Sequence, residues 1–276
     1  MTIEGKVAEV RRFCRRHADE GLARRYAQYF VEGYDAYGVE QGVLERQREL
    51  WLAKWREELG RDGLLRLGGR LVESGKYEEG SVAVWFASAL EEGFTPAVLD
   101  RLGGWLDGGI RNWAHTDYLS LEVLSRFLTR GIVPLKALAG WRGAPSRWKR
   151  RAVPVTLIRL LRTDVPVPRL LRFLAPMMRD PERVVHQGLG WFLREAWKRD
   201  PGAVEGFLLE RLESCPRLVV RTATEKMTPA RRARFARSRP ARASRAPGRP
   251  RPRPTPDLSP GRSSSGSPRR GPRRPS

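Results

Sequence analysis

Residues 81–90 read Ser-Val-Ala-Val-Trp-Phe-Ala-Ser-Ala-Leu, and the spacing of apolar residues in this stretch decides the fold. Val82, Trp85, Phe86 and Leu90 recur at intervals of three and four residues, which places them on one face of a helix. The same spacing continues along most of the 276 residues, and strict alternation over the length of a strand is absent. The sequence therefore predicts an all-α protein.

The starts of several helices are marked by a polar residue followed by proline. The polar side chain can cap the helix, and the missing N–H of proline costs nothing in the first turn. Such pairs occur at Thr95-Pro96, Asp180-Pro181, Asp200-Pro201 and Thr228-Pro229. They lie too close together for long bundle helices, so we expect short helices that pair as hairpins. The expected segments include 22–34, 42–59, 61–74 and 132–141.

Similar short cores recur along the chain. They lie at 81–84, 113–117, 151–153 and 186–189, a period of roughly 35 residues that is close to that of two-helix HEAT-type repeats. Stacked hairpins form a curved solenoid, and Arg and Lys on its concave side would make a groove for a nucleic-acid backbone. We therefore predict a HEAT-like solenoid with a concave basic DNA-binding face. An irregular helical bundle is the alternative.

The charge of the chain favours polyanionic partners. The sequence has 53 Lys and Arg against 31 Asp and Glu, a net charge of +22, which points to nucleic acid first and to an anionic membrane surface second. Residues 237–276 hold 12 Arg, one Asp and 10 of the 21 Pro, with almost nothing apolar to bury. We predict a folded domain over 1–230 and a disordered Arg/Pro/Ser-rich tail over 231–276, which either tethers DNA weakly or is inert.

Several other classes of protein are disfavoured. The two cysteines and three histidines lie far apart, so we expect no metal site and no cofactor. No Gly-rich phosphate loop links a strand to a helix, which argues against nucleotide hydrolysis. The N-terminus lacks an apolar signal core, and no apolar run is long enough to span a bilayer. We expect a cytoplasmic, nucleoid-associated monomer without membrane contact. We expect Glu78 and Glu79 on a solvated or i,i+4-paired helix face.

Three segments have residue types suited to DNA chemistry. Trp113 and Asp117 are four apart and project from one side of a helix, although a core indole and a surface acid give the same spacing. In 146–153 a capped helix start precedes a cationic run suited to phosphate, and an equally good interpretation is a solvated first turn. In 189–197, Gly190 permits close helix approach and one of two indoles could face the groove.

Four motifs in order resemble one family. They are Tyr29 with Gly38-Val39, Asn112-Trp113 with Asp117, Ser146-Arg147-Trp148-Lys149-Arg150-Arg151-Ala152, and Gly190-Trp191-Phe192-Leu193-Arg194-Glu195. Together they resemble the bacterial DNA alkylation repair glycosylases built from HEAT-like repeats, the AlkD-like class, over roughly residues 20–228.

The resemblance implies an activity and a set of site residues. Such enzymes hydrolyse the N-glycosidic bond of purines alkylated at N3 or N7 in double-stranded DNA, without a cofactor. By resemblance Asp117 is the catalytic carboxylate, and Trp113 and Trp191 are the indoles that face the lesion. Arg151 contacts the DNA backbone and Tyr29 lies near the DNA, and we add Arg150 and Lys149 as phosphate contacts.

The resemblance has two departures. Ala114 stands where the family has an acid, and Glu40-Gln41-Gly42-Val43 replaces a Thr-Pro segment with paired arginines. Two other classes of function stay open beside an active glycosylase. One is a catalytically inactive HEAT-like module that recognises DNA shape or backbone. The other is a helical-repeat adaptor for proteins or structured RNA.

Overall fold

The structure is a computed structural model that describes residues 2–90 and 92–236, and these residues form helices and loops without a strand. The prediction of an all-α protein is confirmed. The α-helices are α1 (Ile3–Arg16), α2 (Glu20–Ala27), α3 (Gln41–Val72), α4 (Tyr77–Ser88), α5 (Pro96–Gly108), α6 (Trp113–Leu119), α7 (Ser125–Thr129), α8 (Arg147–Leu160), α9 (Val167–Leu174), α10 (Arg183–Arg199), α11 (Pro201–Leu209), α12 (Arg217–Ala223) and α13 (Pro229–Ala233). A π-helical turn, η1 (Ser120–Leu124), links α6 to α7, and 3-10 turns form η2 (Leu135–Leu138), η3 (Gly140–Gly143) and η4 (Ala175–Arg179).

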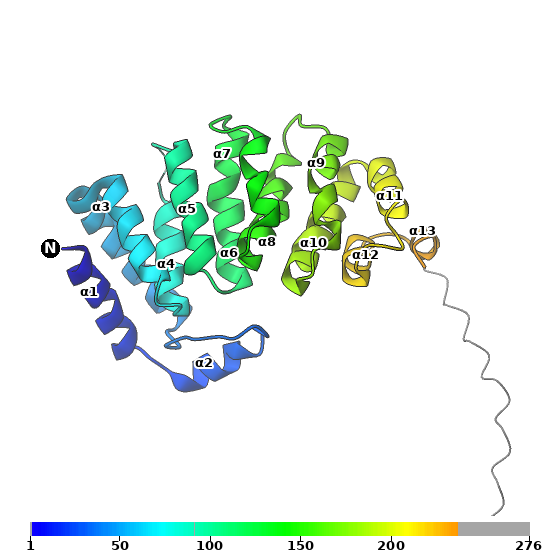
Figure 1. The fold of residues 1–276 in the computed structure, drawn as a ribbon. Helices are drawn as coiled ribbons and strands as arrows, with labels where there is room; N and C mark the ends of the chain where they lie inside the picture. Colours follow the sequence, from blue (N-terminus) through cyan, green and yellow to red (C-terminus); the bar gives the residue numbers. More distant parts are fainter. Residues whose placement is uncertain (1, 91, 237–276) are drawn as a thin grey trace, which may run out of the picture. The chain divides into compact units, whose positions relative to one another are not determined.

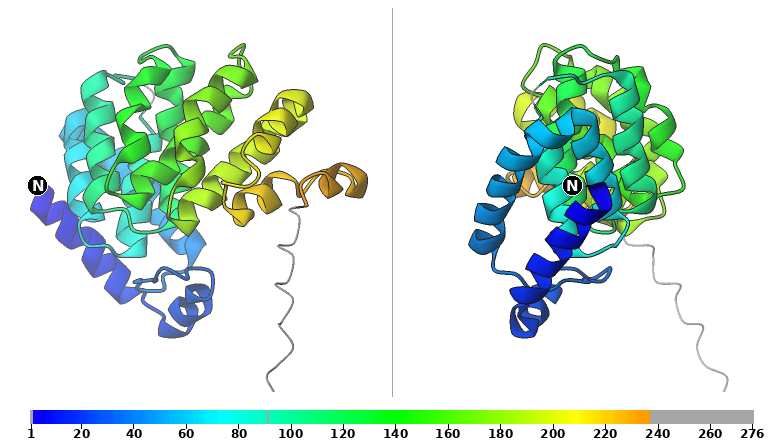
Figure 2. Two further views of the ribbon diagram at one scale, coloured as in Figure 1. Left: turned by 45° about the vertical axis from the view of Figure 1, so that its right-hand side comes forward. Right: turned by 90° about the vertical axis from the view of Figure 1, so that its left-hand side faces the viewer.

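The even-numbered helices from α4 to α12 follow one another side by side, each in contact with the next (Figure 1). The cores predicted at 81–84, 113–117, 151–153 and 186–189 fall on α4, α6, α8 and α10 in turn. The recurring pattern therefore marks one helix of each successive unit. Figure 2 shows the same series from two further directions. The helical-repeat solenoid is confirmed over the described residues.

Two expected helices differ from the structure. The helix expected over 22–34 ends at Ala27, because Phe30 turns inward to pack on the rings of Tyr34, Tyr77 and Trp113. The helix expected over 132–141 is replaced by the two short 3-10 turns η2 and η3. The expected break between 42–59 and 61–74 is present within α3, where Gly60 adopts φ +60°, a conformation that favours glycine.

Three of the four predicted helix caps are confirmed. The side chains of Thr95, Asp200 and Thr228 accept hydrogen bonds from the third residue of their helices. The cap predicted at Asp180 is wrong, since α10 begins later, after Glu182. The Asp180 carboxylate instead binds Arg150, 30 residues away, and the backbone N–H of Glu182. A long-range ion pair thus takes the place of the local cap.

Close packing joins the helices of the series. A Cβ atom on Gly190 would lie 2.6 Å from Cβ of Thr222, so α10 and α12 approach at a point where only glycine fits. This confirms the predicted role of Gly190. The core is continuous along the described residues and includes the fully buried Trp55, Phe86, Phe127 and Phe192.

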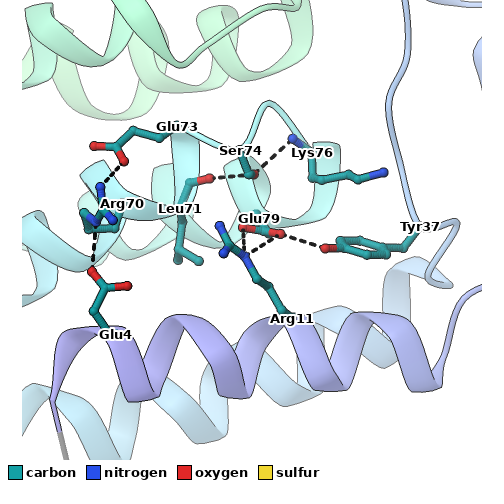
Figure 3. Close-up of polar contacts among 9 residues, drawn as sticks. All are labelled: Glu4, Arg11, Tyr37, Arg70, Leu71, Glu73, Ser74, Lys76 and Glu79. Atoms are coloured by element: carbon teal, nitrogen blue, oxygen red, sulfur yellow. Dashed lines mark hydrogen bonds and ion pairs between the residues drawn. The ribbon is translucent and has the colours of Figure 1, made fainter.

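The N-terminal helix is fastened to the series by charged contacts (Figure 3). Arg11 of α1 donates from Nε to both carboxylate oxygens of Glu79 on α4, at 3.1 and 3.2 Å. The hydroxyl of Tyr37 donates to the same carboxylate at 2.8 Å. Glu4 of α1 accepts from Arg70 of α3 at 2.9 Å. Charges on α1 therefore help to fix the segment that leads into α3.

The C-terminal end of the described chain lies beyond the boundary predicted at residue 230. Helix α13 continues to Ala233, and Phe235 is buried. The remainder of the predicted tail, 237–276, lies outside the described residues. Within the described ranges, no helix combines the length and the apolar character needed to cross a membrane.

Candidate functional site

Helix α6 presents an indole and a carboxylate one turn apart. The helix begins at Trp113 because the Asn112 side chain caps it, accepting from the backbone N–H of His115 at 2.9 Å. Trp113 is 37% exposed, and its Nε1–H donates to the backbone oxygen of Tyr29 at 3.1 Å. The indole also stacks on Phe30, with ring centroids 5.4 Å apart. Its orientation is therefore fixed although much of it faces solvent.

Asp117 forms a buried, two-armed ion pair with Arg151 of the neighbouring helix α8. Nε of Arg151 lies 2.8 Å from Oδ1 of Asp117, and Nη2 lies 2.7 Å from Oδ2. The third arm of the guanidinium, Nη1, donates to the backbone oxygen of Val184 at 2.6 Å. Arg151 thus ties α6, α8 and the start of α10 together around one carboxylate.

The ionisation of Asp117 is set by two opposing effects. Burial raises the pKa of Asp117 above the ordinary aspartate value, and the hydrogen bonds and charge of Arg151 act to lower it. In the described chain, no other donor reaches the Asp117 oxygens. Arg151 is therefore the group that favours the charged carboxylate. The Asp117 side chain keeps 12% of its surface accessible.

The structure brings only part of the predicted site together. Arg151 was predicted to contact the DNA backbone, whereas its guanidinium lies against Asp117 and Val184 in the structure. Arg150 bonds to Asp180 and to the backbone oxygens of Ala144 and Pro145. These two arginines meet protein partners through all their hydrogen-bonding arms.

The remaining predicted contacts are placed on the surface or near it. Lys149 donates to Asp107 at 2.6 Å and lies over the ring of Trp141. Tyr29 is 61% exposed beside Trp113. Trp191 on α10 is half-buried, and its indole makes no hydrogen bond or ring contact with any described residue. Its indole is thus available to a partner.

A stripe on α10 continues from Trp191. Arg183, Gln187, Trp191 and Arg194 are spaced at four, four and three residues, which places them along one face of the helix. Arg183 is exposed and forms no ion pair within the described ranges. Helix α10 packs on α8, which packs on α6, so the stripe lies two helices along the series from Trp113 and Asp117.

Sequence reasoning missed two buried carboxylates on α4. Glu78 and Glu79 were expected on a solvated or i,i+4-paired face, yet both are buried, with exposures of 2% and 1%. Glu78 accepts from the backbone N–H groups of Tyr37, Gly38 and Val39. The two acids hold residues 37–39 in place. The expectation of a solvated or i,i+4-paired face was therefore wrong. Two adjacent acids look the same in the sequence whether they are buried and bind backbone N–H groups or are exposed to solvent.

Sequence reasoning also assigned no role to His115, which supports the start of α6. Its Nδ1 pairs with the Asn112 side chain and its Nε2 with the Ser81 hydroxyl, both at 2.9 Å. Burial lowers the pKa of His115 to about 4, so the ring is neutral near pH 7. A neutral imidazole here holds α6 to α4 without adding charge beside Asp117.

A pocket of about 330 Å³ opens on a neighbouring face of α6. Ala114, His115 and Tyr118 of α6 line it, together with residues of α3, α4 and the 26–39 segment. No group of His, Cys, Asp or Glu in the described residues is arranged to hold a metal ion.

Comparison with known proteins gives a consistent result. The family model for DNA alkylation repair enzymes matches residues 11–227. A solved structure described as a predicted DNA alkylation repair enzyme from Enterococcus faecalis superimposes with a TM-score of 0.65 at 16% sequence identity. That match covers 77% of this chain and 98% of the other. No curated protein matches the sequence.

Proposed function

Since the chain belongs to the DNA alkylation repair enzyme family, we propose that it is a DNA glycosylase that removes purines alkylated at N3 or N7 from duplex DNA. The observation that carries the proposal is the pairing, one turn apart on α6, of a partly exposed indole, Trp113, with a carboxylate, Asp117, held by Arg151. The family assignment supports a role in alkylation repair, and this geometry supports bond hydrolysis in particular.

The proposed reaction asks little of an acid catalyst. An N3- or N7-alkylated purine carries a positive charge, so it leaves as a neutral base when the C1′–N bond breaks and takes the bonding electron pair with it. Positive charge then develops on the sugar. Water adds at C1′ and releases a proton, which leaves a hydroxyl on the sugar. The protein must stabilise the cationic sugar and direct the water.

Asp117 has the chemistry for both tasks. A carboxylate held close to C1′ stabilises oxocarbenium character, by the electrostatic logic that glycosidases use. Its carboxylate must be ionised to do so, which is the form that Arg151 favours. We therefore assign Arg151 as a positioning residue that acts through Asp117, since all three of its arms are bonded within the protein.

Aromatic surfaces near the lesion would favour charged substrates. We propose that the exposed faces of Trp113 and Trp191 lie against the sugar and the cationic base, where a cation–π contact contributes about 0.5–2 kcal/mol. Tyr29 extends the same surface and contacts the duplex. Arg183, which forms no ion pair among the described residues, offers a cation for phosphate on the Trp191 stripe. Arg150 and Lys149 would contact phosphate by exchanging the carboxylates that they bind here.

One observation favours a second candidate, a DNA-binding module without activity. Both oxygens of Asp117 are engaged by Arg151, and the carboxylate is largely buried. If the pair stayed closed on DNA, Asp117 would act only as a structural link between α6 and α8.

The two candidates are separated by measuring release of N7-methylguanine from methylated duplex DNA beside binding to undamaged duplex. The glycosylase proposal predicts release by the purified protein with first-order single-turnover kinetics. Salt-dependent binding without release, at protein concentrations that saturate the DNA, would overturn it in favour of the module.

A further inference from the structure

The pocket beside α6 is built mainly from aromatic rings. Its walls include Tyr26, Phe30, Tyr34, Tyr77, Trp85 and Tyr118, which come from the 26–39 segment, α4 and α6. Its volume of about 330 Å³ falls within the range of small-molecule sites, about 300–1,000 Å³. Ala114 also lines the pocket, and its short side chain leaves that wall open. Aromatic walls of this kind suit a flat ring, because ring faces stack with little regard to sequence or substituent.

Most of the polar groups in the pocket already have partners. Glu78 accepts from three backbone N–H groups. The Ser81 hydroxyl and Nε2 of His115 bond to one another. These groups shape the pocket without offering a directed contact to a ligand. The hydroxyls of Tyr26 and Tyr34 and the Glu45–Arg48 pair of α3 remain, and of these the pair combines a charged donor with a charged acceptor.

Glu45 and Arg48, three residues apart on α3, supply that contact. Nε of Arg48 is buried and has no hydrogen-bond partner among the described residues, and the guanidinium lies over the Trp85 ring, 4.7 Å from its centroid. Nη2 of Arg48 lies 3.5 Å from Oε1 of Glu45. The other Glu45 oxygen accepts no hydrogen bond from the described residues. The Arg48 side chain keeps 19% of its surface accessible, and its Nη1 donates no hydrogen bond within the described residues, so this arm is the one open to a ligand.

We propose that this pocket binds the ring of a 6-oxopurine, the class that contains guanine and hypoxanthine. The purine stacks among the aromatic rings, Arg48 donates to the O6 carbonyl, and Glu45 accepts the N1–H. Arginine is the usual partner of the guanine O6 edge. Adenine presents the reverse pattern, with a donor at position 6 and an acceptor at N1, so it places a donor against Arg48 and an acceptor against Glu45.

The location of the pocket connects it to the DNA-facing residues. Phe30 lines the pocket on one side and stacks on Trp113 on the other. Ala114 and Tyr118 each follow directly after Trp113 and Asp117 on α6. A base displaced from the duplex at Trp113, or a free base in solution, reaches the same ring-lined space. The proposal does not depend on bond cleavage.

Calorimetric titration of the full-length protein with hypoxanthine and with adenine tests the proposal. We expect hypoxanthine to bind at least about tenfold more tightly, since one matched edge discriminates by about that much. Arg48→Met should remove the preference while its stem still covers Trp85. Ala114→Phe, which fills the pocket from its rim, should abolish binding of both bases. Arg211→Met, which removes an arginine over the Phe207 ring elsewhere, should leave the preference unchanged.

Three results would overturn the proposal. They are equal affinity for the two bases, no binding of either base at millimolar concentration, and a preference for hypoxanthine that survives in both pocket variants. Duplexes with a single bulged deoxyinosine or deoxyadenosine identify the source of the base. A preference for bulged deoxyinosine that Arg48→Met removes indicates a base from DNA, and selectivity for the free base alone indicates a soluble ligand. A protein that binds hypoxanthine but releases no N7-methylguanine would retain this pocket and lose the proposed excision.

Discussion

Two adjacent arginines on α8 form the same kind of ion pair in different surroundings. Arg150 holds Asp180 with Nε to Oδ2 at 2.6 Å, and Arg151 holds Asp117 with Nε to Oδ1 at 2.8 Å. The Asp180 carboxylate also accepts a hydrogen bond from the backbone N–H of Glu182. Arg150 also donates to two backbone oxygens of the loop before α8. Asp117 has Arg151 as its only hydrogen-bond donor in the described chain and lies one turn from an exposed indole.

The difference separates a structural pair from a candidate catalytic one. The Arg150–Asp180 pair closes a loop and fixes the approach to α10, so its carboxylate is committed to the fold. The Arg151–Asp117 pair holds a carboxylate in a defined position, and no backbone N–H of the described residues donates to that carboxylate. The same two residue types therefore provide a matched control for each other, and four experiments use this pairing or extend it.

The largest expected effect is on bond cleavage. Asp117→Asn should lower the single-turnover rate of N7-methylguanine release by about 10²–10³-fold or more, because loss of one preorganised electrostatic group costs about that much. Affinity for undamaged duplex should be equal or higher, since a negative charge is removed. Asp180→Asn should keep the rate per folded molecule within a few-fold. Equal losses in the two variants would show that Asp117 is only structural.

The next effect concerns pH. Excision needs ionised Asp117, so its rate should fall as pH drops through the pKa of Asp117, which burial raises above the ordinary aspartate value. Arg151→Met removes the group that lowers this pKa, so the acid limb should move to higher pH. Arg150→Met should leave the limb where it is. Rate–pH profiles of the three proteins check this, and an unshifted limb in Arg151→Met would contradict the role assigned to Arg151.

A smaller effect is expected from the indole next to Asp117. Trp113→Leu should lower excision of a cationic N7-methylguanine by about threefold to thirtyfold, the equivalent of one cation–π contact. Trp197→Leu is the control, because Trp197 is also a partly exposed indole with an Nε1–H bond, to Glu205. Loss of the same size in both variants would indicate general destabilisation, which thermal unfolding would reveal.

The smallest effect concerns phosphate contacts. Arg183→Ala should reduce the slope of log affinity against log salt by about 0.9, the value for one phosphate contact. Lys149→Ala should change the slope less, because Lys149 is already paired with Asp107. Binding titrations with undamaged duplex at several salt concentrations measure both slopes. A larger change of slope for Lys149→Ala than for Arg183→Ala would show that the cationic run of α8 makes the main contact with the DNA backbone.

Local rules predicted much of the fold. The caps at Thr95, Asp200 and Thr228 depend on residues within three positions, and each is present in the structure. The cap at Asp180 failed because Arg150, distant in sequence, competes for the same carboxylate. Propensity and capping rules see only neighbours along the chain, so they miss a competitor that tertiary packing supplies.

In the candidate site, too, contacts between near neighbours in sequence could be predicted and long-range contacts could not. Trp113 and Asp117 share a helix face through their spacing alone, so the sequence could bring them together. The bond from Arg151 to Asp117 spans 34 positions and needs the contact between α6 and α8. The ring-lined pocket draws on four helices and a loop, and the buried Glu78 accepts hydrogen bonds from backbone N–H groups of that loop. Such features arise from tertiary packing and leave no local pattern.

The most direct test of the account is the affinity of the protein for a duplex in which a cationic pyrrolidine replaces one deoxyribose. This analogue mimics the charge that develops on the sugar, and a neutral tetrahydrofuran in the same duplex is the reference. The account predicts that wild type and Asp180→Asn prefer the cationic analogue, and that Asp117→Asn loses this preference while it still binds the reference. A preference that persists in Asp117→Asn would contradict the central claim that this carboxylate stabilises the cationic sugar.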